Sequence, residues 1–476
     1  MQAENLRPRR QLSDLPGPRG LPVLGNLLAL KGQQMHQTLE AWARQYGPYF
    51  CFKILGYRIL AVADHEAVAA LSRDRPEGFR RAARGAQVVK ELGFDVGVFF
   101  ANGDAWSRQR RMVMAGLDPA HMREYFPSLV KVAQRLEGRW RQAARDGAVI
   151  DLQSDLMRYT VDVISGLAFG ADVNTLESDA DVIQRHLDLI FPSVTRRMLS
   201  AIPYWKWFKL PSDRRLDDSI AQVNAAVRGF IADARARLAA EPDRRQTPRN
   251  LLEAMVVAAE QADSGISEAE IAGNVWAMLL AGEDTTANTT AWLIYMLTRN
   301  PAALARAQAE VRAVLGDGSV LDHARLANLD FLEACIHETL RLRPVVPMLS
   351  YQASRDTVLG DVAVPRGTVV WTLYRHDTLQ DRFFPAASDF NPERWLVDEG
   401  PAKVASAAKR VSMPFGAGPR VCPGRYLALT EVKMAMAMLL SRFDIVSVDT
   451  PDAGDVRERV AVTMYPDGLQ MRLKAR

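Results

Sequence analysis

The sequence FGAGPRVCPG, residues 415–424, surrounds one of only three cysteines with three glycines, two prolines and an arginine. Cys422 lies just before an expected helix that begins near Gly424, and a helix N-terminus carries free N–H groups and partial positive charge, which stabilise a thiolate. The glycines let backbone amides approach the sulfur and let a flat ligand approach the backbone. With Arg420 as a nearby cation, the loop predicts a buried thiolate that holds a metal.

A lone cysteine before a helix is more often an inert buried side chain, because free cysteine is among the most buried residue types. Here the spacing Phe-x-x-Gly-x-Arg-x-Cys-x-Gly is specified at many positions within a short loop. Inert packing does not require such a pattern, so the spacing favours a metal ligand at Cys422.

The 476 residues are 48% hydrophobic and 24% charged, with a net charge of +4, which is ordinary globular composition. Basic residues are scattered rather than interleaved with aromatic residues, so the sequence does not predict nucleic-acid binding. The sparse cysteines, Cys51, Cys335 and Cys422, argue against a disulfide framework and a structural zinc site. The first residues contain no apolar run of membrane-spanning length and no signal-peptide core, so we expect a cytoplasmic protein without a membrane span.

The order of patterns along the chain predicts a mainly α fold with a minor β part. A Pro/Gly lead-in at 15–26 precedes an amphipathic helix and two short strands. Residues 105–340 carry apolar residues at three- and four-residue spacing, which predicts helices, and short strands are expected after them. We predict an N-terminal arm and lead-in at 1–26 and one catalytic domain at 27–476.

One expected helix is unusually long. Ser267 and Glu270 fit a capping box, and the helical pattern continues to Pro301, over about 33 residues or roughly 50 Å. Its middle, AGEDTTANTT at 281–290, turns small and polar, which suits function better than packing. The alternative is a helix that is bent by local polar bonding or faces solvent at this point.

Several motifs together resemble those of the cytochrome P-450 family. The cysteine loop is similar to its haem-binding loop, ETLR at 338–341 to its Glu-x-x-Arg motif, FNPERW at 390–395 to its Pro-Glu-Arg segment, and AGEDTT at 281–286 to its oxygen-binding helix motif. WSRQR at 106–110 resembles the Trp-x-x-x-Arg pattern of an earlier helix. The resemblance spans nearly the whole chain and implies the family's fold, with a long central helix over haem.

The resemblance implies that the chain binds haem b, an iron protoporphyrin IX. Cys422 would be the axial ligand of the metal, a thiolate that favours O–O bond cleavage. Glu338, Arg341 and Arg394 would form a buried structural network beneath the haem loop. The residues with a cofactor-binding role by resemblance are Trp106, Arg110, Gly282, Phe415, Arg420, Cys422 and Gly424, of which Trp106, Arg110 and Arg420 would reach the propionates.

One position departs from the family's pattern. Many members carry a further basic residue for a haem propionate shortly after the Glu-x-x-Arg motif, and here Tyr351 occupies that position. Either the phenol of Tyr351 or His376 would have to substitute, and the sequence leaves both open.

Asp284 and Thr285 carry the prediction of activity, because an acid and a hydroxyl are poor choices in the middle of a buried helix. By resemblance, Thr285 would hydrogen-bond dioxygen and Asp284 would pass protons toward it, which is general acid work, while Gly282 would leave room for oxygen. The resemblance thus implies a haem-thiolate monooxygenase that inserts one atom of dioxygen into a lipophilic small molecule, by hydroxylation or epoxidation.

By the same resemblance, electrons from NAD(P)H would arrive through a separate ferredoxin or flavodoxin and its reductase, since we expect no flavin or iron–sulfur domain after Cys422. Arg108 and Arg111 are expected on a solvated basic face. Together with Lys409 and Arg410, they would dock an acidic redox partner. We expect a monomer.

The resemblance also places an apolar substrate pocket above the iron. No buried cation is expected in it, which favours a neutral, bulky substrate over a fatty acid. Ordinary core packing is an equal alternative for each residue of the predicted lining, which comprises Val98, Phe99, Phe100, Trp276, Ala277, Leu280, Ala281, Val346, Met348 and Met464.

Two other functions remain open from the sequence. A peroxide-driven or isomerising haem-thiolate enzyme would share Cys422, although members that use hydrogen peroxide directly tend to lack the Asp284–Thr285 pair. A haem-thiolate sensor or binding protein would need neither that pair nor a roomy apolar pocket.

Overall fold

A computed structural model of the chain describes residues 10–93, 97–117, 119–178, 183–200, 202–316, 322–396 and 403–476. The chain divides into two compact units, each assembled from separate stretches of sequence. Unit 1 comprises Met1–Ala86, His337–Cys422 and Glu458–Met464, and unit 2 comprises Gln87–Ile336, Pro423–Arg457 and Tyr465–Arg476. One catalytic domain over 27–476 stays a prediction.

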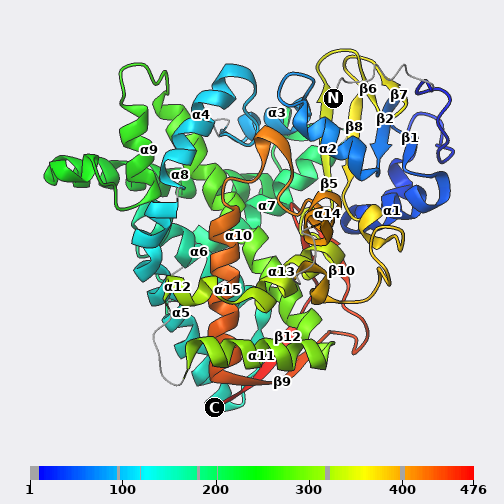
Figure 1. Cartoon of the computed structure of the whole chain (residues 1–476). Coiled ribbons are helices and arrows are strands. Elements are labelled where there is room, and N and C mark those ends of the chain that lie inside the picture. Colours follow the sequence, from blue (N-terminus) through cyan, green and yellow to red (C-terminus); the bar gives the residue numbers. More distant parts are fainter. Residues whose placement is uncertain are drawn as a thin grey trace. The chain divides into compact units, whose positions relative to one another are not determined.

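Unit 1 is built on a five-stranded sheet with the order β1-β2-β8-β5-β3 (Figure 1). β2 and β8 are parallel, whereas the other neighbours are antiparallel, so the sheet joins strands that lie far apart in the sequence. The elements of this unit are α1 Met35–Tyr46, β1 Tyr49–Ile54, β2 Tyr57–Val62, α2 His65–Arg73, β3 Phe79–Arg81, β5 Met348–Ala353, β6 Thr357–Leu359, β7 Val362–Val364, β8 Val369–Leu373, α14 Lys403–Ser412 and β10 Glu458–Val460.

Apolar side chains cover both faces of this sheet, because successive residues of a strand point to opposite sides. Along β2, Leu60 belongs to one buried cluster with Leu71 of α2, whereas Ile59 belongs to another that includes residues of α1. The first cluster also contains Met413, and Ala417 packs against it. The segment that leads into the cysteine loop is therefore anchored on this face of the sheet.

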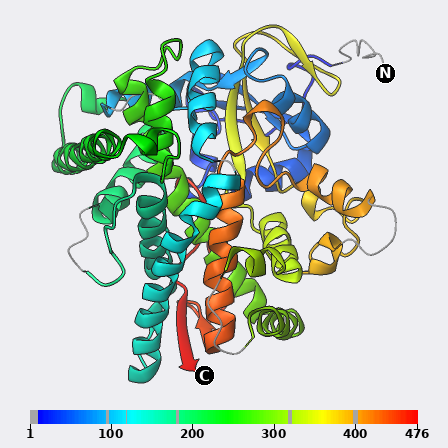
Figure 2. The same ribbon diagram turned by 60° about the vertical axis from the view of Figure 1, so that its left-hand side comes forward.

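Unit 2 is mainly helical and is organised around α10, Glu268–Thr298, which packs along α6, Leu152–Phe169. The orange helix α15, Arg425–Arg442, runs beside α5, Pro119–Asp146 (Figure 2). The other elements are α4 Gly103–Gly116, α7 Ile183–Leu199, α8 Pro211–Ala240, α9 Leu251–Ala259, α11 Pro301–Leu315, α12 His323–Ala327 and a sheet of β4 Ile150–Asp151, β12 Gln470–Ala475 and β9 Phe443–Asp449.

Three elements cross the boundary between the units, namely α3 Ala83–Glu91, α13 Asp330–Leu342 and β11 Met464–Pro466. The prediction of a mainly α fold with a minor β part is confirmed. Among the described residues, no helix is both long enough and apolar enough to cross a membrane.

The predicted long helix is α10, and it begins where the capping box places it. The Ser267 N–H donates to Glu270 Oε2 over 2.9 Å, and the Glu270 N–H donates to Ser267 Oγ over 3.2 Å. The helix contains 31 residues, a length of about 46 Å. Pro301 lies at the first position of the next helix, α11, where its missing N–H costs nothing.

A buried ion-pair network ties three segments of unit 1 together. Arg375 donates from Nη2 to Glu40 Oε2 over 2.7 Å and from Nη1 to Glu458 Oε1 over 2.6 Å. His36 Nε2 lies 2.9 Å from Glu458 Oε2. Burial by itself would raise the pKa of Glu458, but the hydrogen bonds from His36 and Arg375 and the nearby positive charges lower it well below its usual range.

This lowered pKa makes the stability of the fold dependent on pH. A carboxyl group with a depressed pKa in the folded state stabilises the protein above its unfolded pKa of about 4.3, and the stabilisation is lost as the pH falls below that value. We expect Glu458→Gln to lower the free energy of unfolding at pH 7 by about 3 kcal/mol and to flatten its decline between pH 5 and pH 3. Urea unfolding followed by circular dichroism at several pH values measures both effects.

Glu241→Gln is the matched control for Glu458→Gln, because Glu241 is a half-exposed carboxylate paired with Arg244 on the surface. It should leave both the stability and its pH dependence close to those of the wild type. An acid-induced decline that is as steep in Glu458→Gln as in the wild type would contradict the role assigned to the network.

Candidate active site

The cysteine loop in unit 1 is held in a shape that only glycine permits at two positions. Gly416 and Gly418 have φ angles of +76° and +71°, in the left-handed region. A Cβ atom on Gly418 would lie 2.5 Å from the carbonyl oxygen of Ser72, just before the last residue of α2. The Cys422 N–H donates to the Phe415 carbonyl over 2.9 Å, which closes the loop. The loop thus presents a half-buried thiol on a fixed backbone.

The side chains around Cys422 suit a metal that is already bound within a cofactor, and not a free metal ion. Within the described ranges, no three His, Cys, Asp or Glu side chains are grouped so that they could hold a metal ion. A single thiolate, however, is the whole protein contribution that a haem iron needs as an axial ligand. A Cβ atom on Gly416 or Gly424 would meet nothing within 4 Å, so the backbone leaves space for a flat ligand there. These residues fit haem.

Glu338 and Arg341 form a fully buried fork on α13. Arg341 donates from Nε to Glu338 Oε2 over 2.8 Å and from Nη2 to Glu338 Oε1 over 2.7 Å. Arg394 Nε adds a longer bond to Glu338 Oε1, at 3.2 Å. The structure therefore brings together the three side chains of the predicted network, while their effect on haem binding stays a prediction.

Further groups complete this network, and the sequence analysis missed them. Trp395 donates from Nε1 to Glu338 Oε2 over 2.8 Å. The remaining donors of Arg341 are taken by backbone carbonyls of Thr378 at 2.6 Å, Ala387 at 2.7 Å and Asp389 at 3.0 Å. The fork therefore fixes the backbone of residues 378–395, the segment that precedes the cysteine loop.

Asp284 and Thr285 lie on α10 in unit 2 with different surroundings. Asp284 is buried, and its Oδ1 accepts a hydrogen bond from Asn288 Nδ2 over 2.8 Å. Asn288 Oδ1 in turn accepts from Gln153 Nε2 on α6 over 2.9 Å. Thr285 donates from Oγ1 to the carbonyl of Ala281 over 2.7 Å. The acid is thus held by a chain of amides, and the hydroxyl is held by the helix itself.

One face of α10 stays open, while most of the other residues in its middle are buried. Ala277, Leu280, Ala281 and Thr285 recur at three- or four-residue spacing, so they share a face, and all are exposed or half-buried. Gly282 lies elsewhere, because a Cβ atom on it would come within 2.9 Å of Ile164 in α6. Close packing of the two helices accounts for this glycine, and room for oxygen stays a prediction.

Trp106 and Arg110 lie four residues apart on α4 and are half-buried. Between them, the buried Gln109 donates to Glu270 over 3.1 Å and accepts from Asn274 over 3.0 Å, which fixes α4 against α10. Their contact with haem propionates stays a prediction.

The expectation of a solvated basic face holds for only one of its two arginines. Arg108 is half-buried and lies 3.8 Å from Glu270, so its charge is partly neutralised within the protein. Arg111 is exposed, as are Lys409 and Arg410 in unit 1.

Some of the predicted lining residues of unit 2 come together. The Val98 N–H donates to Asn274 Oδ1 over 2.9 Å, which holds the loop of Val98 to Phe100 against α10. Phe99 is 45% exposed and meets Phe100 edge-to-face at 4.8 Å. Trp276 is instead buried, and its Nε1 donates to Asn224 of α8 over 2.7 Å, which fits the packing alternative.

The predicted lining residues of unit 1 also come together. Val346 and Met348 are half-buried and separated by Pro347, and Met348 is the first residue of β5. Met464 is fully buried, and its N–H donates to the carbonyl of Val345 over 2.8 Å. Met464 therefore fits the packing alternative as well, and the pocket itself stays a prediction.

Glu431 on α15 is a further buried acid that the sequence analysis missed. Burial raises its pKa well above the usual range, although a hydrogen bond with Thr286 of α10 opposes the effect. Tyr159 of α6 donates to its backbone carbonyl over 3.1 Å. The signal was available, since Glu431 interrupts the apolar helix sequence LALTEVKMAMAMLL.

Comparisons with known proteins point in one direction. The model of the cytochrome P450 family matches residues 15–472. The chain is 29% identical to mitochondrial 25-hydroxyvitamin D-1 alpha hydroxylase of Homo sapiens, over 96% of this chain and 92% of that protein. It is 28% identical to a self-sufficient cytochrome P450 monooxygenase of Aspergillus niger and 27% identical to a bifunctional cytochrome P450/NADPH–P450 reductase of Bacillus subtilis, and it spans only 43% of each of these two longer proteins.

A solved structure agrees with these relatives. The haem domain of a cytochrome P450DA mutant matches with a TM-score of 0.83 and 25% identity, over 97% of this chain and 98% of that chain.

The Glu338 network generates a prediction about haem retention. Glu338→Ala leaves the buried Arg341 without its counter-charge and frees the segment that precedes the cysteine loop. We expect this variant to be produced without haem, which the ratio of Soret to protein absorbance measures. Glu333→Ala on the same helix is the control, because Glu333 is partly exposed. Normal haem content in Glu338→Ala would refute the assignment.

Proposed function

This chain belongs to the cytochrome P450 family, and we propose that it is a haem-thiolate monooxygenase that inserts one atom of dioxygen into a lipophilic small molecule, by hydroxylation or epoxidation. The observation that carries the proposal is the acid–hydroxyl pair Asp284–Thr285 beside the open, small-residue face of α10. A helix built only for packing has no need of a buried carboxylate at that point.

The cofactor in this proposal is haem b, with Cys422 as its axial ligand. When bound, haem supplies the iron that activates dioxygen, and thiolate ligation favours cleavage of the O–O bond. The loop backbone around Phe415, Gly416 and Gly424 would accept the flat macrocycle. Arg420, Trp106 and Arg110 would bind propionates, because a guanidinium matches a carboxylate in shape and charge.

Asp284 would deliver protons to dioxygen. Its carboxyl group is fixed by Asn288, and the amide of Gln153 connects this pair to the half-buried surface of α6. Thr285 would orient the oxygen molecule with its hydroxyl. General acids of this kind contribute about 10²–10⁴-fold to a rate.

The open face of α10 supports a neutral, apolar substrate. Ala277, Leu280 and Ala281 offer no charge, and the exposed Phe99 stands on the loop that packs beside Asn274 and Ala277. Apolar pockets with few polar groups bind lipophilic ligands through area burial.

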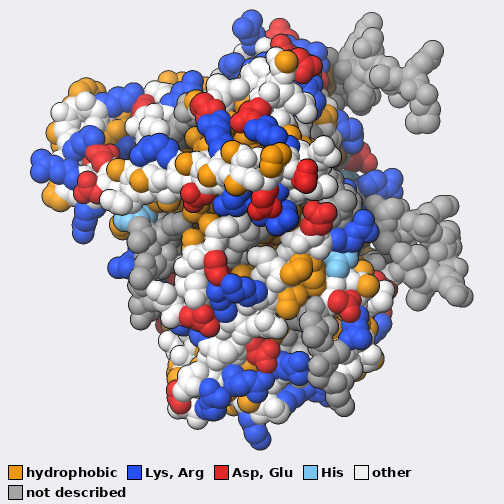
Figure 3. All heavy atoms as spheres, turned by 90° about the vertical axis from the view of Figure 1, so that its left-hand side faces the viewer, with side chains coloured by type: hydrophobic (Ala, Val, Ile, Leu, Met, Phe, Trp, Pro, Cys, Tyr) orange, Lys and Arg blue, Asp and Glu red, His pale blue; other side chains and the backbone are white. Residues whose placement is uncertain are grey.

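Electrons would come from NAD(P)H through a redox partner, a ferredoxin or flavodoxin with its reductase. Two of the similar proteins carry the words self-sufficient or reductase in their names, and the chain matches only part of their length. On the face that Figure 3 displays, basic and acidic side chains are interspersed. An acidic partner would contact exposed cations, and we place this contact at Arg111, Lys409 and Arg410. The protein itself would be cytoplasmic.

The first test is a titration of the ferric protein with terpenoids, steroids, aromatics, macrolides and fatty acids, followed at the Soret band. A neutral lipophile that displaces water from the iron should shift the band saturably, and fatty acids should bind more weakly. Cys422→Ser should lose the spectrum that is specific to thiolate ligation. A wild-type protein without any Soret band, or a Cys422→Ser variant with an unchanged spectrum, would contradict the proposal.

The proton-delivery role generates a second test. Asp284→Asn keeps the side-chain volume and removes the acid, so dioxygen should leave as hydrogen peroxide instead of entering product. We expect product formation to fall by about 10²-fold or more while the Soret response to substrate is retained. Measuring product, peroxide and NADPH consumption together shows the change.

Glu268→Gln, at the exposed start of the same helix, is the control for Asp284→Asn. Product formed at wild-type efficiency by Asp284→Asn would rule out the role of this acid. Wild-type product formed equally fast from hydrogen peroxide alone would favour a peroxide-driven enzyme.

A further inference from the structure

Arg75, just beyond the end of α2, is a buried cation without a counter-charge. Only 4% of the residue is exposed. Its Nε and Nη2 atoms have no hydrogen-bond partner in the described part of the chain, where the side chain forms no ion pair either. Its acidic neighbour in sequence, Asp74, accepts instead from Arg355 over 2.7 Å. A buried guanidinium in this state is costly.

A second arginine is close to the same place. The Arg75 guanidinium lies 4.7 Å from the centre of the Tyr351 ring, and the Arg81 guanidinium lies 5.2 Å from it. The hydroxyl of Tyr351 is 3.3 Å from that of Tyr374. Burial, with a smaller contribution from Arg81, lowers the pKa of Arg75 to about 10. The ring attracts both cations but carries no negative charge, so the buried charge of Arg75 still needs an anion to balance it.

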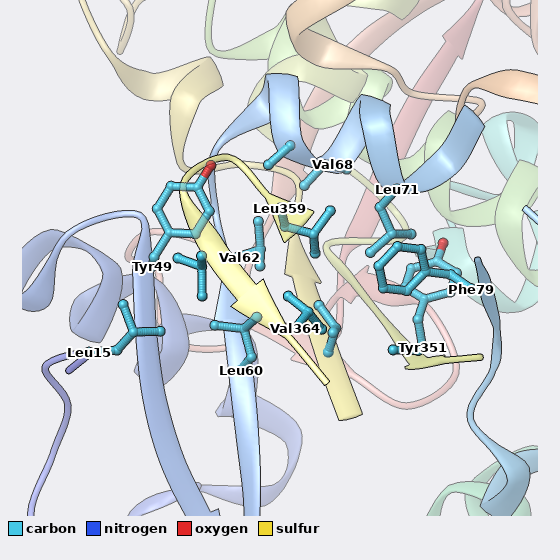
Figure 4. Close-up of a cluster of buried hydrophobic side chains, with 14 of the residues drawn as sticks. Leu15, Tyr49, Leu60, Val62, Val68, Leu71, Phe79, Tyr351, Leu359 and Val364 are labelled. Carbon is cyan, nitrogen blue, oxygen red and sulfur yellow. The ribbon is translucent and has the colours of Figure 1, made fainter. Parts of the chain in front are cut away.

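This cationic cluster lies beside the cysteine loop. Leu71, Phe79 and Tyr351 lie side by side in one buried cluster (Figure 4), to which Met413 belongs and against which Ala417 packs. The contact of Gly418 with Ser72 joins the loop to the end of α2, three residues before Arg75. An anion that belongs to a ligand of the loop could therefore reach the arginines within unit 1.

We propose that Arg75, assisted by Arg81, binds a propionate carboxylate of haem, in place of the basic residue that Tyr351 displaces. The assignment rests on the proposed haem-binding function. A guanidinium accepts a carboxylate through two parallel hydrogen bonds, and the two idle donors of Arg75, Nε and Nη2, form such a fork. Tyr351 acts as the platform that holds both arginines, and His376 is not required.

The test uses the haem-loaded protein and its Arg75→Met and Arg75→Lys variants. Methionine fills a similar volume without charge, and lysine keeps the charge but not the fork. We expect haem transfer to excess apomyoglobin to be about tenfold faster or more in Arg75→Met, since a hydrogen bond to a charged group contributes roughly 1.5–3 kcal/mol. Arg75→Lys should be intermediate. The propionate bending band in the resonance Raman spectrum should shift in both variants.

Arg80→Met is the matched control, because Arg80 lies on β3 next to Arg81 but is exposed and donates to Gln352 over 3.0 Å. It should transfer haem at the wild-type rate with an unshifted Raman band. An unchanged band and transfer rate in Arg75→Met would overturn the proposal. A second result would also overturn it. If chloride or phosphate stabilised the wild type but not Arg75→Met, and left the rate of haem transfer unchanged, the anion bound by Arg75 would be a free ion and not a haem propionate.

Failure of the Arg75 assignment can be told apart from failure of the proposed haem-binding function. If the wild type binds haem and Cys422→Ser alters its spectrum, the function stands whatever Arg75 does. If Arg75→Met does not accumulate as folded protein, the Raman band of Arg75→Lys decides the assignment by itself.

Discussion

The fork between Arg341 and Glu338 is the interaction on which the segment before the cysteine loop depends. Both side chains are fully buried, and a buried guanidinium that loses its partner costs roughly 3–5 kcal/mol. Glu338 satisfies two of its donors, and three backbone carbonyls between Thr378 and Asp389 satisfy the rest. The backbone of that segment therefore has one arrangement that leaves no charge unpaired. Because the buried charge of Arg341 needs all of these partners, it fixes the backbone of the segment that leads to the cysteine loop.

The same requirement for a counter-charge separates the buried arginines of unit 1 into two kinds. Arg341 pairs with Glu338, and Arg375 pairs with Glu40 and Glu458, so carboxylates of the same chain balance their charges when the fold is complete. Arg75 has aromatic rings and another arginine beside it instead. A cation that the fold buries and does not neutralise stabilises nothing until an anion arrives. This difference from Arg341 and Arg375 is the reason for proposing a ligand carboxylate beside Arg75.

Local signals in the sequence predicted the parts of the site that are encoded locally. Ser267 and Glu270 gave the start of α10, and the Glu-x-x-Arg spacing placed Glu338 and Arg341 on one helical face. Arg394 could be added only because its motif resembles a family pattern. The partners of Arg375, Glu40 and Glu458, lie 335 and 83 positions away from it, and no periodicity connects them. Arg108 looked solvated because the sequence does not reveal that Glu270 packs beside it.

The polar residues in the middle of α10 differ in their surroundings. Asn288 bonds toward α6 and Thr286 toward Glu431 of α15, so these residues hold the helix among its neighbours. Only Thr285 stands on the open face, and its single hydroxyl proton already goes to the carbonyl of Ala281. In this arrangement the oxygen of Thr285 faces outward as an acceptor. To donate to a ligand, it must give up a bond worth about 1 kcal/mol, a small cost that leaves the hydroxyl free to change between accepting and donating.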